Sequence, residues 1–234
     1  MEIFNSNCFR IIAVLTAILP VFCEASGMVP ETSVLVVEEQ DGESSMTITN
    51  SDNHPMLLTT SIKGIAQDKE KLIIATPPAI RVEGGKRQLV RFILVSGAPL
   101  KTERLRRVVF SGIPPQSKGK NEVRMSVSQN IPVIIRPAGL PRDDAPWKRL
   151  NWKLTAGKLS VTNESPYVVR LAQSVKVLPG NDVALLPQSY ILPGERITLN
   201  AASGKGINQG DHVQISPATT WGFSVDTFNA PLSQ

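Results

Sequence analysis

The chain has 234 residues, of which 41% are apolar, and a formal net charge of +5. This length fits one large or two modest domains with adequate cores. Basic residues are scattered and only 5% of residues are aromatic, so a nucleic-acid partner is not expected.

The N-terminus has the pattern of a secretory signal. An apolar run, Ile11–Phe22, ends in Cys23-Glu24-Ala25 and is too short to span a bilayer. We therefore predict a signal peptide over residues 1–25, cleaved near Ala25, and an exported product. Lipidation of Cys23 is a weaker alternative, because a bulky phenylalanine precedes it. Cys8 and Cys23 both lie in this segment, so the mature chain would have no disulfide.

Short strands separated by turn residues fill the first half of the chain. Gly, Pro, Asn and Asp mark the turns, and no stretch keeps a helical period for long. The predicted strands are Val34–Val37, Met46–Thr49, Leu57–Ile62, Leu72–Ile74, Gln88–Leu94, Arg107–Phe110 and Val123–Ile135. Such spacing indicates a β-sandwich.

A stiff connector divides the chain at Arg136–Pro146, which contains three prolines and a glycine. Further short strands are predicted beyond it at Lys158–Val161, Tyr167–Leu171, Ser174–Leu178, Arg196–Leu199 and His212–Ile215. We expect two β domains, one over residues 26–137 and a smaller one over 138–234.

Residues suited to catalysis are few. His54 and His212 are the two histidines, and neither has a neighbour at metal-ligand spacing. We expect no catalytic residues, metal or cofactor, and so no enzyme. A hydrolase on a sandwich scaffold stays open as an alternative, because a histidine-centred relay can assemble across a fold.

One strand has the features of a protein-binding edge. Val123, Met125 and Val127 alternate with polar residues, and Ile131 continues the same parity. Pro132 cannot donate a ladder hydrogen bond and therefore belongs at a sheet edge. An edge with an apolar stripe can bind another protein by β-augmentation, although an ordinary half-buried strand has the same pattern.

Several motifs together resemble the periplasmic chaperones of the chaperone–usher pilus pathway, the PapD-like family. They occur in order from about residue 29 to beyond 200, and the similarity weakens towards the C-terminus. The motifs are Ala75–Gly85 with Leu89-Val90-Arg91, Ile113-Pro114-Pro115, Arg136-Pro137-Ala138 and Asn163–Tyr167.

The resemblance implies an all-β fold of two immunoglobulin-like β-sandwiches, set at an angle with a cleft between them. It implies a periplasmic chaperone for pilus or fimbrial subunits, which donates Val123, Met125 and Val127 to a subunit and delivers it to an outer-membrane usher. It also implies an interdomain ion pair of Glu103 and Arg136, whose third member would align loosely with Pro217. Whether the free protein caps its donor strand by forming a self-dimer stays open, although an exposed apolar edge usually needs some such protection.

The sequence departs from the family at the anchor for the subunit's C-terminal carboxylate. The two usual basic positions are occupied by Ser33 and Pro132. Arg170 stands where the family has a small polar residue, and it is a candidate to replace the anchor as a bidentate carboxylate partner. An ordinary solvated strand residue is the other interpretation of Arg170. The alternative is a chaperone-like accessory or structural component of a pilus that has lost the anchor.

Overall fold

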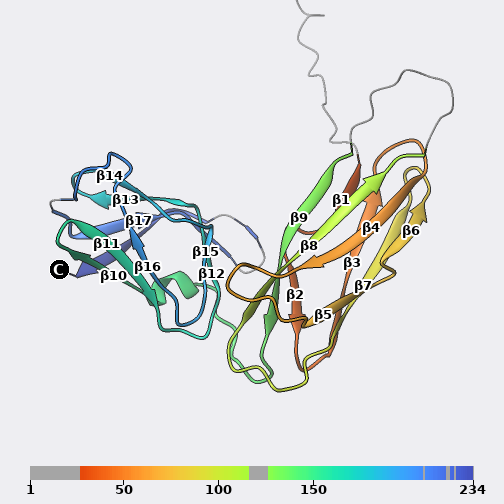
Figure 1. Ribbon diagram of the computed structural model, residues 1–234, viewed down its shortest axis with the longest axis horizontal. Coiled ribbons are helices and arrows are strands. Elements are labelled where there is room, and N and C mark those ends of the chain that lie inside the picture. The colour runs from red at the N-terminus through yellow and green to blue at the C-terminus, as the bar shows by residue number, and fades with distance from the viewer. Residues whose placement is uncertain (1–26, 116–125, 208, 220–221, 224, 234) are drawn as a thin grey trace, which may run out of the picture.

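The computed structural model describes residues 27–115, 126–207, 209–219, 222–223 and 225–233. The predicted signal peptide and the donor positions Val123 and Met125 lie outside the described residues. The described part forms two immunoglobulin-like β-sandwich domains set at an angle, which confirms the predicted fold class (Figure 1). Within it, no helix is long and apolar enough to cross a membrane.

The first domain consists of two sheets packed face to face. Its strands are β1 (Met28–Pro30), β2 (Leu35–Glu38), β3 (Glu43–Asn50), β4 (Met56–Lys63), β5 (Ile73–Thr76), β6 (Ala79–Val82), β7 (Arg87–Leu94), β8 (Arg104–Ile113) and β9 (Ser128–Arg136). The strand orders are β1-β3-β7-β5 and β2-β9-β8-β4-β6. Alternate side chains of each strand enter the core, where Phe92 and Phe110 meet edge to face at 6.3 Å between ring centroids.

The second domain begins with a 3₁₀ turn, η1 (Pro146–Arg149). Its strands are β10 (Leu150–Thr155), β11 (Lys158–Asn163), β12 (Val169–Leu171), β13 (Ser174–Leu178), β14 (Asp182–Leu185), β15 (Tyr190–Ile191), β16 (Arg196–Leu199), β17 (His212–Ile215), β18 (Pro217–Ala218) and β19 (Phe228–Ser233). The larger sheet has the order β14-β13-β17-β19-β10-β11-β16, and the smaller one β15-β12-β18. A bridge between Ala184 and Ala201 joins the two ends of the larger sheet, so this sheet curls around its core.

Each domain contains a fully buried asparagine that closes one end of its sandwich. Asn50, the last residue of β3, donates from its side-chain amide to the carbonyls of His54 and Val82. Asn163 ends β11, and its amide donates to the carbonyls of Tyr167 and Ile191. The two domains therefore satisfy buried loop carbonyls by the same construction.

A third apolar cluster lies where the domains meet. From the first domain it includes Val34, Ile65, Leu105 and Ile134, and Val168 comes from the second. Tyr190 and Leu192 pack against it. Strands β12 and β15 therefore lie on the side of the second domain that faces the first (Figure 1).

Candidate functional site

Part of strand β9 is an open sheet edge. On one side β9 pairs with β8 along almost its whole length. On the other side, the parallel strand β2 pairs only with Val133–Arg136. Among the described residues, Ser128–Pro132 therefore has no strand partner on that side. Pro132 is the last residue of this open edge, a position where its missing N–H breaks no ladder bond.

Val127 is the described donor position, and it lies directly before β9. It has the parity of Ile131 and Val133, which are buried in the core of the first domain. Val127 itself is 47% exposed. Val127 is therefore an exposed apolar side chain at the start of the open edge, on the same face of the strand as the buried Ile131 and Val133. Val123 and Met125 stay predictions.

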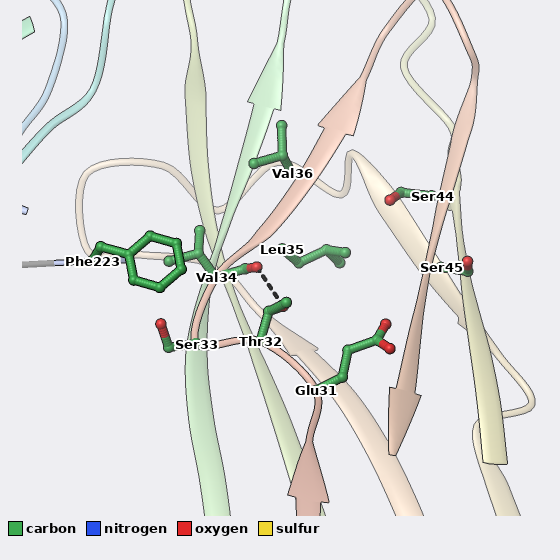
Figure 2. A pocket seen from close by; sticks show the side chains of 9 residues that line it. All are labelled: Glu31, Thr32, Ser33, Val34, Leu35, Val36, Ser44, Ser45 and Phe223. Carbon is green, nitrogen blue, oxygen red and sulfur yellow. Dashed lines mark hydrogen bonds between the residues drawn. The ribbon is translucent and has the colours of Figure 1, made fainter. Parts of the chain in front are cut away.

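Ser33 lies against the backbone of the second domain. A Cβ built on Gly222 would come within 2.2 Å of Ser33 Oγ and 2.7 Å of Val34 Cγ2, so the two chains pass each other at close range. Figure 2 shows the adjoining hollow, where Phe223 from the second domain lies beside Val34. This hollow has a volume of about 390 Å³, and Glu31 is the one charged residue among the described residues that line it. The position therefore holds a small side chain and supplies no positive charge.

Arg170 lies at the junction of the domains on β12, between Tyr190 of β15 and Ala218 of β18. Burial lowers the pKa of Arg170, and the nearby charge of Arg107 lowers it further. Its Nη1 is buried, and within the described part of the chain it has no hydrogen-bond partner.

Arg107, on β8, is a residue that the sequence reasoning did not single out as a site residue. It is the direct cross-strand partner of Pro132. The pairing of adjacent strands β8 and β9 was the signal that could have found it, since paired residues project to the same face. A positive charge is therefore present next to Pro132, on the neighbouring strand.

Glu103 and Arg136 are brought together at the base of the first domain. Arg136 Nε donates to Glu103 Oε1 at 3.2 Å, and Arg136 Nη1 donates to Glu38 Oε1 at 2.8 Å. Both members of the predicted pair are almost fully buried. Burial raises the pKa of Glu103, although hydrogen bonds from the Val168 N–H and from Arg136 favour its charged form. The second domain contributes the backbone N–H of Val168, which donates to Glu103 Oε2 at 2.8 Å.

A loop of the first domain also reaches the second. Asp68 accepts hydrogen bonds from both terminal nitrogens of the buried Arg106, at 2.8 and 2.7 Å. Burial opposes its charged form, but the bonds from Arg106 and Arg104 hold the pKa of Asp68 below its usual range. Beside this anchored aspartate, Gln67 donates to Gln188 at 2.8 Å.

The two histidines lie apart, one in each domain, and both are exposed. His212 Nδ1 is 3.0 Å from the exposed carboxylate of Asp211. No cluster of three or more His, Cys, Asp or Glu side chains that could hold a metal occurs among the described residues.

Comparisons with known proteins match both domains. Residues 27–141 match the model of the pili and flagellar-assembly chaperone PapD N-terminal domain, and residues 145–228 match that of the pili assembly chaperone PapD C-terminal domain. The chain is 40% identical over 203 residues to the uncharacterized fimbrial chaperone YhcA of Escherichia coli K12, covering 85% of this chain and 88% of that protein.

Two solved structures show the same fold at lower identity. The E. coli chaperone DraB is 23% identical, with a TM-score of 0.71 over 88% of this chain and 98% of that one. The SafB chaperone complex with the Salmonella enterica SafA pilin gives a match of 21% identity and a TM-score of 0.72, covering 89% of this chain and 98% of the matched chain.

Proposed function

Because the chain belongs to the family of PapD-like pilus assembly chaperones, we propose that it binds pilus or fimbrial subunits in the periplasm by donating an edge β-strand. It then delivers them to an outer-membrane usher. The partner in this proposal is a subunit whose own sandwich is incomplete, so that a strand from outside completes it.

The open edge of β9 is the observation that carries the proposal. Among the residues that the structure describes, none pairs with the backbone of Ser128–Pro132 on one side, and Val127 stands exposed at its start. Backbone hydrogen bonds along such an edge provide affinity, and alternate apolar side chains provide fit to a groove. Each donated apolar side chain that becomes fully buried contributes about 1.5–3 kcal/mol.

An open apolar edge needs protection in the free protein. A dimer in which two copies cover each other's β9 would supply it, and subunit binding would then displace the second copy. This part of the proposal predicts a dimer that dissociates when a subunit is added, observable by sedimentation.

Co-expression with pilin subunits tests the proposal. Wild type is expected to yield a soluble one-to-one complex with its subunit, whereas a Val123→Ser, Met125→Ser, Val127→Ser triple variant is expected to yield none. Leu89→Ser is the matched control, because Leu89 is 51% exposed on β7, in the other sheet. A triple variant that retains the complex would contradict strand donation.

A second candidate function is that of an accessory or structural pilus component. Ser33 and Pro132, which carry no charge at the two usual anchor positions, favour it. It predicts that well-folded wild type captures no subunit and is itself found in the assembled fibre.

A further inference from the structure

The loop between β4 and β5, residues 64–71, is fixed to the first domain by a buried arginine. Arg106 lies on β8 with the parity of the core residue Val108, and only 1% of its side chain is exposed. Among the described residues Arg106 makes five hydrogen bonds, and four of them go to Asp68 and Glu70 of this loop. The loop is therefore bonded to a side chain that lies in the core itself.

An arginine at this core position is not explained by stability alone. Replacement of a buried ion pair by apolar side chains of similar volume is often neutral or stabilising. What the guanidinium provides is geometry, because its planar fork binds both carboxylate oxygens of Asp68, at 2.8 and 2.7 Å, and the carbonyl of Glu70, at 3.0 and 2.8 Å. These bonds fix the position of the loop relative to β8.

A closed turn holds the tip of this loop against the second domain (Figure 1). The N–H of Ile65 donates to the carbonyl of Asp68 at 3.0 Å and the N–H of Asp68 to the carbonyl of Ile65 at 3.2 Å. Gln67, at the tip, donates from Nε2 to Gln188 Oε1 at 2.8 Å and accepts at Oε1 from the hydroxyl of Tyr190 at 3.3 Å. Both ends of the Gln67 amide thus bond to the second domain.

The two partners of Gln67 are themselves held in place. Gln188 Nε2 donates to Glu195 Oε1 at 3.0 Å, and Glu195 Oε2 accepts from the N–H of Leu192 at 2.8 Å. Tyr190 packs against the interdomain cluster. Because each partner has a second support, the contact joins two fixed parts of the protein rather than two freely moving side chains.

This contact is separate from the bond between Glu103 and Val168. The loop and the segment around Glu103 are two walls of one hollow of about 270 Å³, and Leu192 and Pro193 of the second domain form a third. Five buried residues make up the apolar cluster between the described parts of the domains, and domains with so small an apolar interface move relative to each other unless other contacts hold them. Attachment at Glu103 alone lets the second domain turn about that point, whereas attachment at Gln67 as well removes most of this freedom.

We propose that the loop 64–71 is a brace that sets the angle between the two domains, with Gln67 as a positioning residue for subunit capture. The role in capture rests on the proposed function. The open edge Ser128–Pro132 belongs to the first domain, and Ile134, two residues beyond it, belongs to the interdomain cluster. A subunit strand bound along this edge therefore ends close to the second domain. The angle between the domains decides whether the second domain supports the bound subunit or obstructs it.

Residual dipolar couplings measured by NMR test the brace in the absence of any subunit. In wild type the amides of both domains are expected to fit one alignment tensor, because the domains share one orientation. Gln67→Ala removes both bonds to the second domain, and the common tensor is expected to be lost. Gln214→Ala is the matched control and keeps it, because Gln214 donates to Asn229 within the second domain, at 3.3 Å. The two variants are expected to melt at similar temperatures, since Gln67 is exposed.

A charge pair tests whether the link between the domains is itself the cause. Gln67→Glu alone sets a carboxylate against the side-chain oxygen of Gln188 and is expected to behave like Gln67→Ala. Combining it with Gln188→Lys is expected to restore the common tensor, because the ammonium group then lies between the carboxylates at positions 67 and 195. If the double variant keeps two different tensors, the link between positions 67 and 188 does not set the angle.

Co-expression with the pilin subunit that wild type captures tests the role in capture. Gln67→Ala is expected to lower the affinity for the subunit about threefold to tenfold relative to Gln214→Ala, because only part of the free protein then has the competent angle. A common tensor in Gln67→Ala overturns the brace. A lost common tensor with undiminished capture overturns the assignment of Gln67 as a positioning residue. If wild type captures no subunit, the proposed strand donation fails, while the dipolar couplings still decide whether the brace exists.

Discussion

Glu103 Oε2 in the first domain accepts a hydrogen bond from the backbone N–H of Val168 in the second, at 2.8 Å. In return, the N–H of Glu103 donates to the carbonyl of Pro166, also at 2.8 Å. The reciprocal pair fixes the segment before β12 against the segment before β8. Because Glu103 is also bound by Arg136, the ion pair of the first domain is connected to the backbone of the second.

Replacement of Glu103 by alanine is expected to loosen this connection. It leaves the Val168 N–H unpaired and removes one acid from the buried Arg136, at a cost of about 3 kcal/mol in unfolding free energy. Chemical unfolding measures the loss, and small-angle scattering is expected to show a wider range of domain positions. Glu83→Ala is the control, since the Arg81–Glu83 pair is exposed and such pairs contribute about 0–1 kcal/mol. Equal effects of the two substitutions would contradict the assigned role.

The Asp68 carboxylate is expected to make stability depend on pH. Its pKa is lowered in the folded state, so its charge stabilises the fold above the ordinary carboxyl range, and this contribution is lost as pH falls through the folded-state pKa. Asp68→Asn is expected to lose about 3 kcal/mol near pH 7, because Arg106 loses its acid. The denaturant midpoints of the two proteins are expected to approach each other as pH falls below about 4, and to meet only below the folded-state pKa of Asp68. A gap that stays constant down to pH 2 would refute this assignment.

The close approach at Gly222 is expected to make it intolerant of a side chain. Its φ of 87° already disfavours an L-residue, and a Cβ would overlap Ser33 Oγ and Val34 Cγ2. Gly139→Ala isolates the conformational part, because Gly139 has φ 75° and nothing within 4 Å of an added Cβ. Gly222→Ala is expected to lower the melting temperature more than Gly139→Ala does. A double variant that combines Gly222→Ala with Ser33→Gly is expected to regain part of the lost melting temperature. If it regains none, the overlap with Ser33 is not the cause of the loss.

The paired asparagines give a prediction for each domain. Asn163→Ala removes both donors to the carbonyls of Tyr167 and Ile191, and Asn50→Ala does the same for His54 and Val82. Unsatisfied buried groups cost about 1–3 kcal/mol each, so each variant is expected to be destabilised by at least 2 kcal/mol. Hydrogen exchange is expected to report the loss mainly in the substituted domain. If either substitution lowers protection from hydrogen exchange equally in both domains, the two asparagines do not stabilise their domains independently.

The sequence was sufficient for the all-β class and for most strands of the first domain, because alternation and turn residues are local signals. Strand β10 is absent from the predicted set although Leu150 and Trp152 alternate inward, since it follows directly on a proline-rich connector and a 3₁₀ turn. The predicted strand at Tyr167 begins at Val169 in the structure. There, Asn163 and Ser165 fold the preceding residues into a side-chain-bonded turn.

The candidate site was harder to predict, because its charges come from different strands. Arg170 was recognised through a departure from a family pattern at its own position. Arg107 became visible only through its register with Pro132, which is a property of strand pairing and not of either residue alone. The hydrogen bond from the backbone N–H of Val168 to Glu103 does not depend on the side chain at position 168, so the sequence could not predict it.

The contact between Ser33 and Gly222 has a consequence for the exchange of domains among related chaperones. Ser33 and Gly222 lie nearly 190 residues apart in the chain, and the space that they share has room for the serine side chain but not for a second side chain at position 222. A hybrid that joins this second domain to a first domain with a long side chain at position 33 would force the two modules apart. Positions 33 and 222 are therefore expected to be inherited together, and a functional hybrid would have to exchange both.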